Sequence, residues 1–336
     1  MNPYTDILRK SVDNNIPLFT HLDLTYNCNL RCIHCYIEKR EEKELSFYEI
    51  TNIFEQLAEA GTLYLILSGG EIFTRNDFFP LARYAREKGF VLLLSTNGTL
   101  IDRDIADQIR ELHPLKVEIS IYGASAVTHD SITRVPGAYN KSIEAIKLLI
   151  DRNVRTLIKC PVMNKNISEL NELKELAEKL GAEFISNPTI SPKENGDKSP
   201  LKYVLSDCQM VSYFKDNVVA YEIRETKEDI PICNSGRCIS AISAYGDVYP
   251  CRLLNISGGN IREKKFDEIW NSGNIFSRVR SLSLNDFNKC TTCEYLPYCQ
   301  PCMGLFLLEK NSLTLPSNEV CKKAWALKEY NERQEI

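Results

Sequence analysis

The sequence predicts an α/β protein in which parallel strands alternate with helices and a cysteine-rich region follows. Between residues 18 and 186, short apolar runs alternate six times with amphipathic stretches, the pattern of repeated strand–helix units. Beyond residue 200 the alternation stops, and nine of the 13 cysteines occur there. The chain therefore divides into a strand–helix part and a cysteine-rich part.

The predicted strands are rich in Leu, Ile and Val on consecutive positions, which suits strands covered by helices on both faces. They comprise residues 18–24, 62–67, 90–95, 116–121, 156–162 and 183–186. Helical spacing is clearest where Phe47, Ile50 and Phe54 form one stripe, and again over 170–180, which ends at Gly181. We expect these helices to coat the sheet.

Composition and charge exclude several classes of function. The 336 residues can bury a large core, and a net charge of -4 with mixed signs indicates neither a nucleic acid nor a membrane as partner. The first 17 residues lack the apolar stretch of a signal peptide, and no apolar run could span a bilayer. We therefore expect a cytoplasmic protein whose cysteines are metal ligands rather than disulfides.

Cys28, Cys32 and Cys35 follow the first predicted strand in the motif CNLRCIHCY. The loop at the carboxyl end of a parallel strand is where such sheets build their sites. Structural zinc normally takes four protein ligands, so a group of three indicates a distant fourth ligand or a metal with an open position. The spacing C-x3-C-x2-C resembles the radical S-adenosylmethionine (SAM) superfamily, in which three cysteines hold a 4Fe-4S cluster and the fourth iron binds SAM.

Polar motifs end the next three predicted strands at the same edge: SGGE, STNGT and ISIYG. By the resemblance, the GGE motif binds the amino group of SAM, Ser120 contacts the ribose and Arg134 the carboxylate. The peptide unit at His34 is expected to meet the adenine. The residues that the resemblance assigns to SAM binding are His34, Gly69, Gly70, Glu71, Asn97, Ser120 and Arg134.

Eight further cysteines suffice for two four-ligand sites, and their spacing alone fits zinc ribbons as well as iron-sulfur clusters. The segments C-x4-C, G-x4-C and C-x2-C-x5-C resemble the SPASM extension of radical SAM enzymes. The resemblance implies one auxiliary 4Fe-4S cluster on Cys233, Cys238, Cys251 and Cys302, and a second on Cys290, Cys293, Cys299 and Cys321. The family usually spaces its last pair C-x3-C, whereas two residues separate Cys299 and Cys302, which leaves the partners of Cys302 open.

The expected fold is a partial (β/α)6 TIM-like barrel with a C-terminal SPASM domain. We predict an N-terminal extension (1–17), the barrel (18–187), a bridging linker (188–232), the SPASM domain (233–321) and a C-terminal helix (322–336). The SPASM core is expected to form around metal rather than around apolar side chains.

The resemblance implies an enzyme that reductively cleaves SAM to a 5'-deoxyadenosyl radical, which abstracts a hydrogen atom from its substrate. A ribosomally made peptide is the leading hypothesis, modified by a thioether or carbon–carbon crosslink, epimerisation or oxidation. The expected electron donor is flavodoxin or ferredoxin. If the substrate has a leader peptide, either a separate recognition protein or the barrel itself is expected to bind it. Two alternatives stay open: a small-molecule substrate such as a tetrapyrrole in haem biosynthesis, and a non-catalytic zinc-binding interaction protein.

Three residues outside the ligand sets bear on these hypotheses. Sulfatase-maturating relatives carry an aspartate base directly after the cysteine of the G-x4-C segment, where this chain has Arg252, which disfavours that activity. Cys160 and Cys208 are candidate hydrogen donors to a substrate radical. The simpler interpretation for Cys160, which falls within a predicted strand, is a buried apolar residue.

Overall fold

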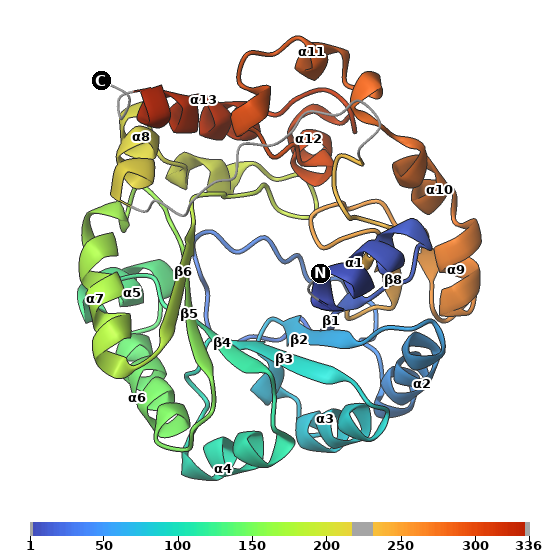
Figure 1. Cartoon of the computed structure of the whole chain (residues 1–336). Coiled ribbons are helices and arrows are strands. Elements are labelled where there is room, and N and C mark those ends of the chain that lie inside the picture. The colour runs from blue at the N-terminus through green and yellow to red at the C-terminus, as the bar shows by residue number, and fades with distance from the viewer. Residues whose placement is uncertain (1–2, 217–230, 333–336) are drawn as a thin grey trace.

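The computed structural model describes residues 3–216 and 231–332 (Figure 1). Part of the predicted linker (217–230) and the outermost residues of the two terminal segments (1–2 and 333–336) lie outside the described residues. Helix α1 (Pro3–Asp13) precedes the first strand.

Six parallel strands form the wall of a partial barrel and neighbour one another in chain order. They are β1 (Phe19–Thr25), β2 (Tyr64–Gly69), β3 (Val91–Thr96), β4 (Lys116–Ser120), β5 (Thr156–Pro161) and β6 (Glu183–Asn187). Every boundary falls within two residues of its predicted position. The predicted fold class is thereby confirmed.

Helices cover the outer face of this wall (Figure 1). They are α2 (Phe47–Glu59), α3 (Phe78–Glu87), α4 (Arg103–Leu112), α5 (Ala126–Thr133), α6 (Ala138–Ile150) and α7 (Leu170–Leu180), with short 3-10 turns at Ile72–Thr74 and Ile167–Glu169. Helix α2 begins at a capping box in which Ser46 and Glu49 each satisfy the other's backbone N–H.

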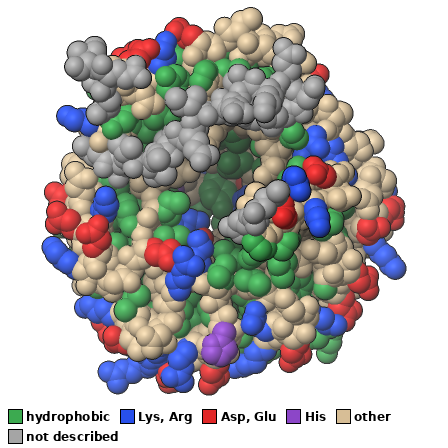
Figure 2. Space-filling model, in the orientation of Figure 1, with side chains coloured by type: hydrophobic (Ala, Val, Ile, Leu, Met, Phe, Trp, Pro, Cys, Tyr) green, Lys and Arg blue, Asp and Glu red, His purple; other side chains and the backbone are tan. Residues whose placement is uncertain are grey.

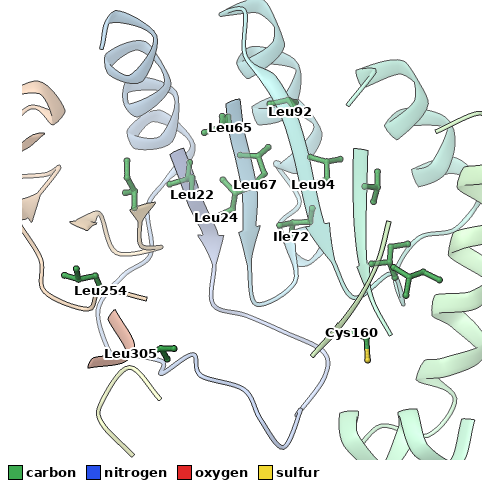
Figure 3. Close-up of a cluster of buried hydrophobic side chains, with 14 of the residues drawn as sticks. Leu22, Leu24, Leu65, Leu67, Ile72, Leu92, Leu94, Cys160, Leu254 and Leu305 are labelled. Atoms are coloured by element: carbon green, nitrogen blue, oxygen red, sulfur yellow. The ribbon is translucent and has the colours of Figure 1, made fainter. Parts of the chain in front are cut away.

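Alternate side chains of the strands point to opposite faces of the barrel wall, one set into the apolar core and the other into a polar interior. Leu22 and Leu24 of β1 are fully buried, and the leucines at matching positions of β2 and β3 continue the same cluster (Figure 3). Each such leucine stabilises the fold by about 1.5–3 kcal/mol through burial. The intervening residues, such as His21 and Ser95, line the barrel interior, because successive strand side chains point to opposite faces.

The sheet continues past β1 into the C-terminal region. Strand β7 (Ile239–Ile242) pairs in parallel with β1, and β8 (Asp247–Tyr249) and β9 (Gly259–Asn260) follow as antiparallel neighbours. The resulting sheet has nine strands in the order β6-β5-β4-β3-β2-β1-β7-β8-β9. The predicted barrel and SPASM regions therefore share one sheet.

The C-terminal helices form an arc from the β6 side of the barrel to the β1 side (Figure 1). They are α8 (Asp207–Asp216), α9 (Phe266–Ser272), α10 (Asn274–Ser281), α11 (Asn288–Thr291), α12 (Met303–Lys310) and α13 (Asn318–Glu332), with 3-10 turns at Ser199–Tyr203, Leu284–Asp286 and Leu296–Tyr298. No helix within the described residues has the length and apolar character needed to cross a membrane.

The expectation that the C-terminal region would lack an apolar core was wrong. Three aromatic side chains, Phe266, Trp270 and Phe276, are each at most 2% exposed. The ring of Trp270 packs against the other two, with centroids 5.9 Å and 5.0 Å away. The indole Nε1 of Trp270 donates to the carbonyl of Asn15, 2.6 Å away. This core is continuous with that of the barrel, so metal ligands are an addition to apolar packing and not a substitute for it.

Candidate functional site

A cavity of about 1150 Å³ lies between the barrel and the C-terminal region. The face of the molecule drawn in Figure 2 is hollowed near its centre, where hydrophobic side chains are visible. Its wall includes the loop after β1, the carboxyl ends of β2 to β5, part of the segment 187–203, and helix α13. Cys28, Cys32 and Cys35 line it, and so does Cys302 from the C-terminal region. The cysteines of the first motif and one cysteine of the second region thus face the same space.

The glycine pair after β2 fastens the cysteine loop to the sheet. Gly70 N–H donates to the carbonyl of Thr25 at 2.7 Å, and Glu71 N–H donates to that of Asn27 at 2.8 Å. A Cβ at Gly69 would lie 2.1 Å from Thr25 O, and one at Gly70 would lie 2.3 Å from Asn27 O. Only residues without a side chain allow the two backbones to approach this closely.

The carboxylate of Glu71 lies behind the cavity wall rather than on it. It is fully buried and accepts hydrogen bonds from Thr96 Oγ1 at 2.7 Å, Asn97 N at 2.7 Å and Phe73 N at 3.2 Å. Burial raises the pKa of Glu71, and these hydrogen bonds oppose that rise. Glu71 therefore ties the end of β2 to the end of β3, and the ammonium contact stays a prediction.

Asn97 connects the loop after β3 to the first cysteine. Its side-chain amide donates to Asn29 Oδ1 at 2.9 Å and approaches Cys28 Sγ at 3.8 Å, while Leu30 N–H approaches the same sulfur at 3.4 Å. Donors of this kind stabilise a ligating thiolate and tune the metal that it binds. The structure thus gives Asn97 a place beside the cysteine loop.

The three thiols of this loop lie within electrostatic range of one another. Burial, with smaller contributions from the neighbouring Cys35 and Cys28, raises the pKa of Cys32 to about 12. Mutual repulsion of this kind is relieved when a metal takes up the thiolates, so the donor set fits an iron-sulfur cluster. Within 3–216 and 231–332, no three His, Cys, Asp or Glu residues are placed to hold a single metal ion. A single zinc ion holds its thiolate sulfurs about 3.8 Å apart. In a 4Fe-4S cluster each thiolate binds a different iron, so the sulfurs are farther apart.

His34, between two of these cysteines, has a neutral imidazole. Its ring packs edge-on against Tyr122 with centroids 4.8 Å apart, and burial lowers its pKa to about 4. The loop is also paired with the end of α5, where Arg31 N–H donates to Thr133 O at 3.0 Å. Directly after this contact Arg134 adopts a left-handed conformation with φ 59° and ends the helix.

Most residues predicted to bind SAM line this cavity, and Glu71 does not. Those that line it are His34, Gly69, Gly70, Asn97, Ser120 and Arg134.

The cysteines of the C-terminal region gather in two groups. Burial is the main cause of the raised pKa of Cys238, Cys251 and Cys302, and the thiol of Cys233 contributes to all three shifts. Cys302 therefore lies beside the first predicted set, despite its unusual spacing from Cys299.

The second group contains Cys290, Cys293 and Cys321. Burial raises the pKa of Cys290 and Cys321, and the thiol of Cys293 raises both further. Cys299 and Cys302 both lie within electrostatic range of the Lys323 ammonium, whose pKa burial lowers. Lys323 thus lies near Cys299 and Cys302 and also lines the cavity.

The two candidate hydrogen donors lie elsewhere. Cys160 is 2% exposed within the apolar core and accepts from Asn166 Nδ2 at 3.6 Å, and burial raises its pKa to about 12 (Figure 3). Cys208 is exposed in the first turn of α8. Neither lines the cavity, so the structure gives the hydrogen-donor hypothesis no support.

Sequence reasoning missed a charged network inside the barrel. Asp23 on β1 is 1% exposed and forms ion-pair contacts with His21 and with Arg252, and Arg252 reaches Glu194. The available signal was the pair of polar residues at alternate positions of an apolar strand, His21 and Asp23. Arg252 could not be linked to them from the sequence, because it lies more than 200 residues away.

The cavity wall is strongly basic although the chain as a whole is acidic. Among the described residues that line it, only Glu118 and Glu319 are acidic. The cationic lining residues are Arg31, Lys39, Arg134, Lys159, Lys193, Lys202 and Lys323. Such a surface attracts anionic ligands.

Comparison with known proteins agrees with this geometry. Residues 22–177 match the radical SAM superfamily, and residues 233–303 match the SPASM iron-sulfur cluster-binding domain. An AdoMet-dependent heme synthase of Methanosarcina barkeri is 31% identical over 320 residues, which cover 86% of this chain and 91% of the synthase. The chain belongs to the radical SAM superfamily.

A further relative of this radical SAM protein has a different named activity, and a solved structure shares its fold. The mycofactocin maturase MftC of Mycolicibacterium smegmatis is 26% identical over 92% of this chain and 83% of its own length. The crystal structure of Streptococcus suis SuiB bound to its precursor peptide SuiA has the same fold, with a TM-score of 0.69 and 18% identity over 96% of this chain and 81% of SuiB.

Membership of the family establishes the cofactors and the enzyme class. The protein is a radical SAM enzyme with a SAM-binding 4Fe-4S cluster and auxiliary iron-sulfur clusters. The prediction of a radical SAM protein with a SPASM extension, similar to peptide maturases, is confirmed. The hypothesis of a non-catalytic zinc-binding protein is thereby set aside.

Proposed function

We propose that this radical SAM enzyme modifies a peptide held in the basic cavity. The cavity carries the proposal because it extends from the three-cysteine loop to Cys302, so a substrate there can face both the SAM site and an auxiliary cluster. Its volume of about 1150 Å³ slightly exceeds the range of about 300–1,000 Å³ typical of small-ligand sites, as expected where SAM and a substrate bind together. The relationship to MftC supports a peptide as substrate.

The residues of the chain have separable roles in this proposal. Cys28, Cys32 and Cys35 would hold the cluster that binds SAM, and the glycine pair after β2 would keep their loop in place. When bound, this cluster supplies the electron that cleaves SAM and yields a radical able to take a hydrogen atom from carbon. Arg134 and Ser120 would orient SAM beside this loop, and the cavity walls would limit the access of water to the reaction.

The test is a reaction of the reconstituted, reduced protein with SAM and with short peptides encoded beside its gene. Mass spectrometry of the peptide distinguishes the outcomes. A loss of two hydrogens supports a crosslink or an oxidation, and an unchanged mass with deuterium uptake from solvent supports epimerisation. The Cys28→Ala variant is the matched control and should form no 5'-deoxyadenosine. SAM cleavage without any change to the peptides would refute the peptide proposal.

A tetrapyrrole with several carboxylates is the second candidate substrate. The heme synthase of Methanosarcina barkeri, with 31% identity, favours it, and seven cationic residues on the cavity wall suit carboxylates equally well. Iron-coproporphyrin III, added in place of the peptide, tests this candidate in the same assay. A shift in its mass that requires SAM would favour the tetrapyrrole over the peptide.

A further inference from the structure

An imidazole on the cavity wall is held by a buried carboxylate. His21 and Asp23 are alternate residues of β1, so their side chains lie on the same face of the strand. His21 Nε2 is 3.2 Å from Asp23 Oδ1. The His21 side chain is 23% exposed, whereas that of Asp23 is 1% exposed. A ligand in the cavity therefore meets the imidazole and not the carboxylate.

Asp23 is held in turn by a residue of the C-terminal region. Arg252 Nε lies 3.0 Å from Asp23 Oδ2, and Arg252 Nη1 donates to Glu194 Oε1 at 2.6 Å. The guanidinium also lies over the ring of Tyr36, 4.6 Å from its centroid. Burial raises the pKa of Asp23, but Arg252 and His21 outweigh this effect and keep it below its usual value. Asp23 is therefore ionised in the folded protein.

An ionised carboxylate that contacts one imidazole nitrogen helps the other nitrogen to accept a proton. It keeps a proton on Nε2 and stabilises the ring when Nδ1 takes up a second proton. Among the described residues, none makes a hydrogen bond to Nδ1 of His21 that would occupy it.

The carboxylates on the cavity wall already have cationic partners. Glu118 lies 3.2 Å from Lys116 Nζ and 2.8 Å from Lys159 Nζ. Glu319 lies 3.5 Å from Lys322 Nζ. Proton uptake by either residue would give up these ion pairs, whereas proton uptake by His21 would strengthen its contact with Asp23.

The geometry points to His21 as the catalytic base of the reaction, with Asp23 and Arg252 as the residues that position it. This inference rests on the proposed function, in which a substrate radical closes onto a second group X–H. The C–X bond forms and the X–H bond breaks. An auxiliary cluster held by cysteines of the C-terminal region would accept the one electron released, and the proton would pass to Nδ1 of His21.

The first test compares product and 5'-deoxyadenosine in the same reaction mixture for wild type and His21→Gln. We expect the variant to form 5'-deoxyadenosine at nearly the wild-type rate while product formation falls about 10²-fold, the usual contribution of a general base. The iron content and melting temperature should not change, which separates a chemical role from a structural one. His113→Gln is the matched control, because His113 ends α4 and does not line the cavity. The inference would be overturned if His21→Gln formed product and 5'-deoxyadenosine in the same ratio as the wild type.

A second measurement needs no substrate and so separates this inference from the proposed function. The holoenzyme is treated with diethyl pyrocarbonate, and the modified histidines are mapped by mass spectrometry. We expect His21 to react and Asp23→Asn to slow that reaction, because the carboxylate makes the imidazole more nucleophilic. If His21 stays unmodified while His113 reacts, the inference is overturned even if the peptide assay succeeds. If Asp23→Asn does not fold, the wild-type labelling and His21→Gln decide the question.

Discussion

Replacing Gly70 by alanine tests how the cysteine loop is positioned. The new Cβ would lie 2.3 Å from Asn27 O and 2.8 Å from Asn27 C, both backbone atoms. Restoring van der Waals contact requires a displacement of about 1 Å, which threatens the hydrogen bonds from Gly70 N to Thr25 O and from Glu71 N to Asn27 O. Two such bonds at about 1 kcal/mol each, with about 1–3 kcal/mol of overpacking, predict a loss of about 3–5 kcal/mol in the free energy of unfolding.

The functional effect should exceed what this loss of stability implies, because the displaced segment leads directly into Cys28. A misplacement of about 1 Å in a catalytic site can lower the rate about 10²-fold. The assay is 5'-deoxyadenosine formation by the reduced holoenzyme, together with chemical denaturation of the same preparation. Gly89→Ala is the matched control, because φ is +90° there but no atom lies within 4 Å of the added Cβ. If Gly70→Ala cleaves SAM within about twofold of wild type, the role assigned to this close approach is refuted.

Three further predictions follow from the site and the core. Cys28→Ala should abolish SAM cleavage yet retain the iron bound by the eight distal cysteines, and loss of all iron in metal analysis would contradict separate clusters. Arg252→Gln leaves the Asp23 carboxylate buried without its guanidinium partner and should cost about 3–5 kcal/mol in urea unfolding at neutral pH. Because the folded-state pKa of Asp23 lies below its usual value of about 3.9, the pair stabilises the fold above that pH. The difference between wild type and Arg252→Gln should therefore shrink as the pH falls through the folded-state pKa, and a constant difference would argue against an ionised pair. Trp270→Ala should cost about 3–5 kcal/mol, and a stability loss under 1 kcal/mol would contradict a tightly packed C-terminal core.

The barrel could be predicted because short apolar runs alternate regularly with amphipathic helical stretches along this part of the chain. Strands such as 90–95 lie between turn residues and amphipathic helices, so their local pattern matches their burial. Strands β7 to β9 have only two to four residues, which is too few to show any period. Strand β7 pairs with β1, which lies more than 200 residues earlier in the chain, and β8 and β9 extend the sheet from β7.

The candidate site could likewise be predicted only in part from the sequence. The positions of Cys28, Gly69 and Asn97 followed from strand order, because parallel strands end at one edge of a sheet. The burial of the Glu71 carboxylate did not follow, since a motif names residues but not the direction in which side chains point. The contact between Asp23 and Arg252 depends on tertiary packing that no local pattern encodes.

The pairing of β7 with β1 has a consequence for any attempt to trim the protein. Without β7, the backbone N–H and C=O groups of β1 from Phe19 to Leu22 would lose their partners on that side. An exposed, apolar strand edge of this kind is a template for pairing with other chains. A fragment that ends before residue 231 should therefore self-associate or aggregate, even though it keeps the three-cysteine loop and every strand of the barrel.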